Sequence, residues 1–128
     1  MHKKHNPDTI VAPFSNYAQG VETAPGLRWL HVSGQVGVRK DGSCPAEFAQ
    51  QFEIAMDGVL EVLKAAGMGP EDIVKITTFM TDPKDLPASR PIRERKLGGV
   101  PVASTLIYVV GLARPDWKVE IECTAAKA

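Results

Sequence analysis

The chain has 128 residues, of which 44% are hydrophobic and 23% are charged. Its 15 Lys and Arg residues equal its 15 Asp and Glu residues in number, so the formal net charge is zero. These values are ordinary for one globular domain with its own core. They exclude the overall basic excess that is typical of nucleic-acid-binding proteins, and we expect no nucleic-acid partner.

The sequence shows no sign of a targeting or membrane segment. Residues 1–5 are basic, but the apolar segment of a secretory signal does not follow them. No apolar run approaches the roughly 20 residues that cross a bilayer, so we expect no membrane association. We therefore predict a single cytoplasmic domain over residues 1–128, with residues 1–9 as a flexible tail.

The first third of the chain favours short strands. Residues 10–14 and 17–23 are typical of broken extended segments, and residues 27–38 of a longer strand. Pro25-Gly26 is a turn signal, which predicts a hairpin between the segments on either side. Gly34 and Gly37 indicate a β-bulge or a close backbone approach. Either a neighbouring pocket or packing alone would explain them.

A helix is predicted to begin after Pro45 and to end at Gly67. Its apolar residues recur at spacings of three or four: Phe48, Phe52, Ala55, Val59, Leu63 and Ala66. The opposite face is polar: Gln51, Glu53, Glu61 and Lys64. We expect Phe48 and Phe52 to belong to the core.

The next segments predict a turn at residues 70–72, a strand over 74–80 and a second helix within 82–97. That helix contains Pro83, Pro87 and Pro91, so it is expected to begin late or to be interrupted. Its polar part is Arg90, Arg93, Glu94, Arg95 and Lys96. This run could bind anions, but a solvated helix face is favoured. Gly98-Gly99 ends the helix.

Two final strands, over residues 105–110 and 117–124, flank a connection that contains Pro115 and Asp116. This pattern predicts antiparallel neighbours. The element order ββαβαββ then gives an α+β fold, with two helices on one face of a mixed sheet. The strand over 105–110 is apolar on both faces. Since the helices cover one sheet face, we expect a second copy of the chain to cover the other.

The last strand separates its residues by face. Val119, Ile121 and Cys123 share one face, and Glu120, Glu122 and Thr124 share the other. Two carboxylates on a strand are costly to bury. The acidic face is therefore either a functional site or a solvated surface, and the alternation alone leaves both open.

The remaining reactive residues suggest no cofactor and no metal. Cys44 and Cys123 indicate no disulfide framework; Cys123 is expected to be buried, and Cys44 has no assigned role. The three histidines, His2, His5 and His31, lack the spacing of a metal site. The Gly34-Gln-Val-Gly37 segment lacks the Lys and the following helix of a phosphate loop.

Three segments together resemble the RidA/YjgF family, also called endoribonuclease L-PSP: Tyr17-Ala-Gln-Gly20, Val32-Ser-Gly-Gln-Val36 and Val119-Glu-Ile-Glu122. The resemblance extends over residues 13–126. It implies a chorismate-mutase-like α+β fold and a homotrimer with ligand pockets between subunits. Family members with deaminase activity hydrolyse reactive 2-imino or enamine acids to keto acids and ammonia.

The resemblance also implies site residues. It assigns catalysis to Glu120 and Tyr17, and substrate binding to Ser33, Gly34, Ser104 and Thr105. The family's carboxylate-binding Arg has no match, because Ala103 or Ser104 occupies its place. A bidentate Arg–carboxylate pair contributes on the order of 1.5–3 kcal/mol. Arg114 is the nearest substitute in sequence, although a solvated loop charge is the favoured explanation for it.

Two functions of different classes follow. The first is a hydrolase that acts on a small imine or enamine metabolite, in which Glu120 orients a water or protonates the leaving nitrogen. The missing Arg argues against ordinary 2-imino acids as its substrates. The second is a non-catalytic trimeric protein that binds a small ligand in the same pocket. A ribonuclease role is a distant third.

Overall fold

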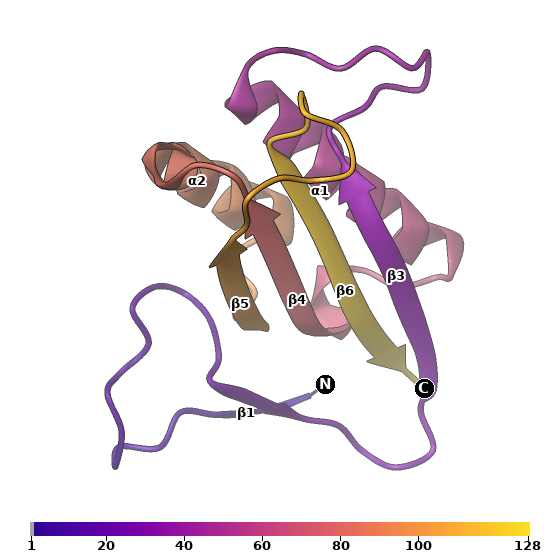
Figure 1. The fold of residues 1–128 in the computed structure, drawn as a ribbon. Coiled ribbons are helices and arrows are strands. Elements are labelled where there is room, and N and C mark those ends of the chain that lie inside the picture. Colours follow the sequence, from indigo (N-terminus) through magenta and orange to yellow (C-terminus); the bar gives the residue numbers. More distant parts are fainter. Residues whose placement is uncertain (1) are drawn as a thin grey trace.

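The computed structural model describes residues 2–128 and has an α+β architecture (Figure 1). Its main sheet has four strands, one pair of which is parallel. In spatial order these strands are β3 (Arg28–Val36), β6 (Val119–Lys127), β4 (Ile73–Met80) and β5 (Ala103–Tyr108). The predicted α+β class with a mixed sheet is therefore confirmed.

Two helices, α1 (Phe48–Ala65) and α2 (Leu86–Leu97), lie behind this sheet in Figure 1. The core lies between helices and sheet, and its largest fully buried side chains include Phe52 and Met56 of α1 and Ile76 and Ile121 of the sheet. Burial of this apolar area is the main driving force for the fold. The other face of the sheet has no helix among the described residues, which leaves it available for other contacts.

The two last strands are not neighbours, contrary to the prediction. β6 lies between β3 and β4 and is antiparallel to both, whereas β5 pairs in parallel with β4 on its other side. The connection over residues 109–118 therefore passes the end of β4, as Figure 1 shows. An apolar pattern identifies a strand, but pairing is set by long-range packing that this pattern does not contain.

The N-terminal segment also differs from the prediction. Within the expected tail, β1 (Lys3–His5) pairs with β2 (Gly20–Glu22) in a separate two-stranded sheet. The His5 Nε2 lies 2.6 Å from the Glu22 carboxylate across this pair. The turn with Gly26 at φ +77° leads into β3, but β2 and β3 do not form the predicted hairpin.

Helix α1 begins and ends close to the predicted positions, and Gly67 follows it at φ +70°. Phe48 and Phe52 are buried, as predicted. Gln51 was assigned to the polar face but is fully buried. Its Nε2 donates to the carbonyl oxygens of Pro45 (2.8 Å) and Asp116 (2.9 Å), and its Oε1 accepts from the Lys118 N–H (2.8 Å). These partners make the burial of an amide favourable.

Helix α2 is continuous rather than interrupted. A short 3-10 turn, η2 (Pro83–Asp85), precedes it, and Pro87 stands in its first turn, where no N–H is required. Pro91 lies inside the helix on its exposed side. Another 3-10 turn, η1 (Pro70–Asp72), precedes β4. Within residues 2–128 neither helix is long and apolar enough to span a membrane.

Candidate functional site

The acidic residues of β6 lie on the helix-free face of the sheet. Val119, Ile121 and Cys123 are buried toward the helices, as the alternation predicts, while Glu120 is half-buried and Glu122 is exposed on the opposite face. Glu120 stands in register with Val36 of β3 and Phe79 of β4. Glu120 therefore lies on an inner strand of the sheet, near the end at which β3 and β4 finish.

A bulge in β3 receives this carboxylate. The β3–β6 register shifts between Val32 and Gln35, the segment that contains Ser33 and Gly34. A Cβ atom on Gly34 would lie 2.7 Å from Cδ of Glu120 and closer still to a carboxylate oxygen. Because glycine has no side chain, the Glu120 carboxylate can lie against the β3 backbone. The predicted residues Gly34 and Glu120 are thus brought together, with Ser33 exposed beside them.

Thr105 lies on the same face, two strands away from β6. Its hydroxyl accepts a hydrogen bond of 2.5 Å from the Lys75 ammonium. In register, Thr105 stands opposite Thr77, which in turn stands opposite Glu122. With a spacing of about 4.8 Å between strands, Thr105 lies about 10 Å from the backbone of β6.

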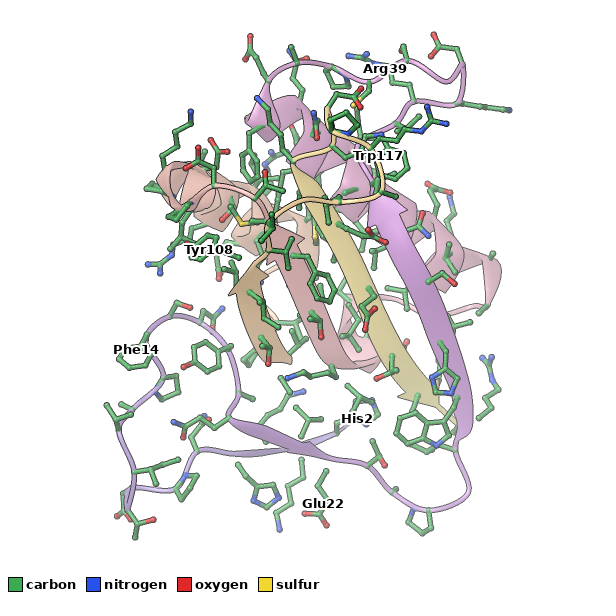
Figure 2. All side chains as sticks on the ribbon, in the orientation of Figure 1. His2, Phe14, Glu22, Arg39, Tyr108 and Trp117 are labelled. Carbon is green, nitrogen blue, oxygen red and sulfur yellow. The ribbon has the colours of Figure 1, made fainter. Side chains whose placement is uncertain are left out.

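A cavity of about 320 Å³ lies on the other side of the sheet, between α2 and the outer edge of β5. Its polar lining residues are Ser15, Tyr17, Thr78, Ser89, Arg90, Arg93 and Ser104. Its apolar lining residues include Phe14, Phe52, Leu86 and Leu106. In Figure 2, Phe14 and Tyr108 lie at the left, toward β5. The volume is at the lower end for small-molecule sites.

Tyr17 and Ser104 therefore belong to this cavity and not to the Glu120 face. Ser104 is in register with Ile76, whose side chain enters the core, so both point to the helix side of the sheet. The Tyr17 hydroxyl accepts a hydrogen bond from the Phe14 N–H (3.2 Å), which leaves its own proton for another acceptor. Within one chain, Tyr17 and Glu120 are on opposite sides of the sheet.

Arg114 lies neither on the Glu120 face of the sheet nor in the Tyr17 cavity. Its guanidinium lies 5.8 Å from the centroid of the Trp117 ring, a cation–π arrangement. Both residues line a different cavity, of about 290 Å³, together with Cys44 and Asp116. Trp117 is at the top of the sheet in Figure 2, far from Phe14.

Arg93 was assigned to a solvated helix face, but it lines the Tyr17 cavity. Its Nε and Nη2 atoms are buried and have no hydrogen-bond partner among residues 2–128. Burial lowers the pKa of the Arg93 guanidinium, and the nearby Arg90 lowers it further, while Glu94 opposes the effect. A pattern could have indicated this position, because Leu86, Ser89, Arg93 and Leu97 are spaced by three or four and share the inner face of α2.

The thiols are unsuited to nucleophilic chemistry. Burial, with a smaller effect of Glu122, raises the pKa of Cys123 to about 12. Burial and then Asp116 raise the pKa of Cys44. Within residues 2–128 no three His, Cys, Asp or Glu side chains are grouped so that they could hold a metal ion.

The fold and the two sets of residues define a class: a small α+β domain with a carboxylate over a β-bulge on its open face and a cavity at its sheet edge. The chain belongs to the Endoribonuclease L-PSP family, whose model matches residues 8–127. This is the RidA/YjgF family that the sequence segments predicted.

Three similar proteins illustrate the family. The 2-iminobutanoate/2-iminopropanoate deaminase of Escherichia coli is 30% identical over 99% of both chains. The Rid-family protein YyfB of Yersinia pestis, described as of unknown function, has 30% identity and a TM-score of 0.86 over 98% of both chains. The structure of E. coli TdcF with bound serine has 27% identity and a TM-score of 0.74, over 93% of this chain and 91% of that one.

Proposed function

We propose that the protein is a hydrolase that converts a small imine or enamine metabolite to a carbonyl compound and ammonia. The observation that carries this proposal is the position of the Glu120 carboxylate. It lies against the β3 bulge because Gly34 has no side chain that would occupy this space. The deaminase named among the relatives supports the same chemistry. Serine bound to TdcF supports a site for a small amino-acid-like molecule.

The reaction adds water across a C=N bond, so that R₂C=NH and H₂O become R₂C=O and NH₃. Glu120 would accept a proton from the attacking water and pass it to the nitrogen as the C–N bond breaks. Ser33, exposed beside the bulge, would donate a hydrogen bond to the substrate. A half-buried carboxylate suits this role because it can contact both water and a bound ligand.

The pocket of this proposal is completed by a second protomer. Tyr17 and Ser104 lie on the side of the sheet opposite Glu120, so one chain cannot direct all three toward one ligand. In a homotrimer, the β5 edge of one protomer would meet the Glu120 face of the next. The large apolar side chains exposed along this edge, Leu106, Ile107 and Tyr108, favour such a contact.

Ammonia release tests the proposal. Imines generated in situ by an amino-acid oxidase would be supplied to the protein, with semicarbazide trapping as a second readout. We expect Glu120→Gln to abolish turnover without changing the molecular mass of the assembly. Glu122→Gln is the matched control, because Glu122 is on the same strand and face but exposed. Equal turnover by Glu120→Gln and wild-type protein would remove Glu120 from the mechanism.

The alternative is a non-catalytic trimeric ligand-binding protein. One observation favours it: Ala103 or Ser104 stands where the family's carboxylate-binding Arg is expected. This function predicts saturable binding of small ligands with no ammonia release from any imine.

A further inference from the structure

The unpaired edge of Arg93 is the feature that the proposed function leaves unexplained. Its two buried, unpartnered atoms within the described chain are Nε and Nη2. The N–H groups of these atoms lie on the same side of the planar guanidinium. They form the parallel fork that matches the two oxygens of a carboxylate.

Two cations that follow Arg93 in α2 have acidic partners, which distinguishes Arg93 from them. Arg95 donates to the Glu53 carboxylate at 2.8 Å, and Lys96 donates to Asp57 at 2.6 Å. Glu94 follows Arg93 in sequence, but its carboxylate accepts a hydrogen bond from Asn16. Arg93 thus has no acidic partner among residues 2–128.

The charged residues that line the cavity beside Arg93 are all cationic. They are Arg90 and Arg93, and none of the described lining residues is acidic. Arg90 precedes Arg93 by three positions, so the two lie on adjacent parts of one helix face. Two cations around a partly closed space raise the local positive potential. A buried charge without a partner is unfavourable, and an anion in the cavity would relieve this cost.

The other lining residues of the cavity indicate which group the carboxylate of the ligand would be attached to. Phe14, Phe52 and Leu106 offer apolar contacts, and the Tyr17 hydroxyl offers a proton. A carboxylate attached to a short hydrocarbon chain would use both kinds of contact. Inorganic phosphate would use the cations alone.

We propose that this cavity binds a small carboxylate with an apolar side chain, and that the Arg93 fork is the group that holds its carboxylate. A rotation about the terminal torsions of Arg93 would turn the fork toward the cavity. If the proposed function holds, this carboxylate is that of the imine substrate. The carboxylate anchor of the pocket would then come from helix α2 instead of strand β5.

Calorimetry with stable keto acids tests the site without requiring turnover. The probes are 4-methyl-2-oxopentanoate, its neutral analogue 4-methyl-2-pentanone, and inorganic phosphate. We expect wild-type protein to bind the keto acid and neither of the others. Arg93→Met should reduce the affinity roughly ten- to hundredfold. Arg95→Met, the same change at an exposed and paired position two residues further on, should bind as wild type.

Equal binding by Arg93→Met and wild type, or equal binding of the ketone and the keto acid, would overturn the inference. Preferential binding of phosphate would do so too. Melting curves identify any variant that fails to fold, and Arg93→Lys then tests the fork, since it keeps the charge and should bind more weakly than wild type. The two proposals fail separately. Keto acid binding through Arg93 with no ammonia release would refute only the hydrolase, and turnover of carboxylated imines by Arg93→Met at the wild-type rate would refute only the anion site.

Discussion

The side chain of Glu120 occupies the space that a side chain at position 34 would need. A Cβ atom on Gly34 would lie 2.8 Å from Glu120 Cγ and 2.7 Å from Cδ. Gly37, three residues further along the chain, is closely packed against helix α1 instead. A Cβ atom on Gly37 would lie 2.5 Å from the backbone Cα of Gln51. Gly34 makes room for the carboxylate of a side chain, and Gly37 makes room for the backbone of helix α1.

These two glycines give opposite predictions. Gly34→Ala should fold with nearly wild-type stability, because the Glu120 side chain can turn away, but ammonia release should fall at least tenfold since the carboxylate is displaced. Gly37→Ala should instead lower the free energy of unfolding by about 2–4 kcal/mol, because helix α1 must move. Urea unfolding and the ammonia assay measure both effects. Wild-type turnover by a folded Gly34→Ala protein would contradict the role given to this contact.

Arg93 should reduce the stability of the ligand-free protein. Replacing it with Met keeps much of its length and removes two buried nitrogen atoms that have no hydrogen-bond partner, so Arg93→Met should raise the free energy of unfolding by about 1–3 kcal/mol. The melting temperature should rise by a few degrees. Arg95→Met serves as control and should be neutral or slightly destabilising, because it removes an exposed ion pair with Glu53. A lower melting temperature for Arg93→Met would mean that Arg93 has a partner in the assembly.

Gln51 should contribute strongly to stability although it is polar. Its amide joins α1 to the carbonyl oxygens of Pro45 and Asp116 and to the N–H of Lys118, so it fixes the connection that leads into β6. Gln51→Leu would leave these backbone groups without partners and should cost about 2–4 kcal/mol. Gln50→Leu, its exposed neighbour, should change stability by less than about 0.5 kcal/mol. Equal melting temperatures for the two variants would show that water replaces the amide.

The burial of Cys123 makes stability depend on pH in the alkaline range. Because its pKa rises to about 12 in the folded protein from 9.0, the folded state keeps the thiol proton where the unfolded state loses it. The part of the free energy of unfolding that comes from this thiol is therefore fully present below pH 9 and is lost as the pH rises toward 12. The total loss should amount to on the order of 2–4 kcal/mol near pH 12. Cys123→Ala should unfold with a shallower alkaline decrease than wild type, and parallel pH curves would contradict this account.

The sequence predicts local structure better than long-range arrangement. The alternation of Val119 to Cys123 and the spacing of α1 follow from burial on one face, and both are confirmed. Strand pairing is different, since the position of β6 between β3 and β4 depends on contacts between distant segments. Gln51 and Arg93 were assigned to solvent because their residue types are usually exposed. Their environments come from distant backbone groups and from a cavity, which local periodicity does not describe.

The same distinction applies to the site. The resemblance assigns Tyr17, Gly34 and Glu120 to one pocket, but in a single chain Tyr17 lies across the sheet from the other two. If the pocket is shared between protomers, as proposed, a test of the assembly is also a test of the site.

Ile107 provides that test. It is 43% exposed and stands opposite Phe79, as Glu120 does, so it is on the helix-free face beside the edge of the sheet. If three copies bury this face, Ile107→Glu places an unpaired charge in the interface and should give a 13.8 kDa monomer in light scattering where wild type gives three times that mass. The monomer should also lose turnover, because each pocket would keep only its Tyr17 half or its Glu120 half. Lys64→Glu, a charge reversal on the exposed face of α1, should leave the trimer intact. A wild-type monomer that releases ammonia would contradict the shared pocket, since one chain would then perform the reaction with Tyr17 on the wrong side of the sheet.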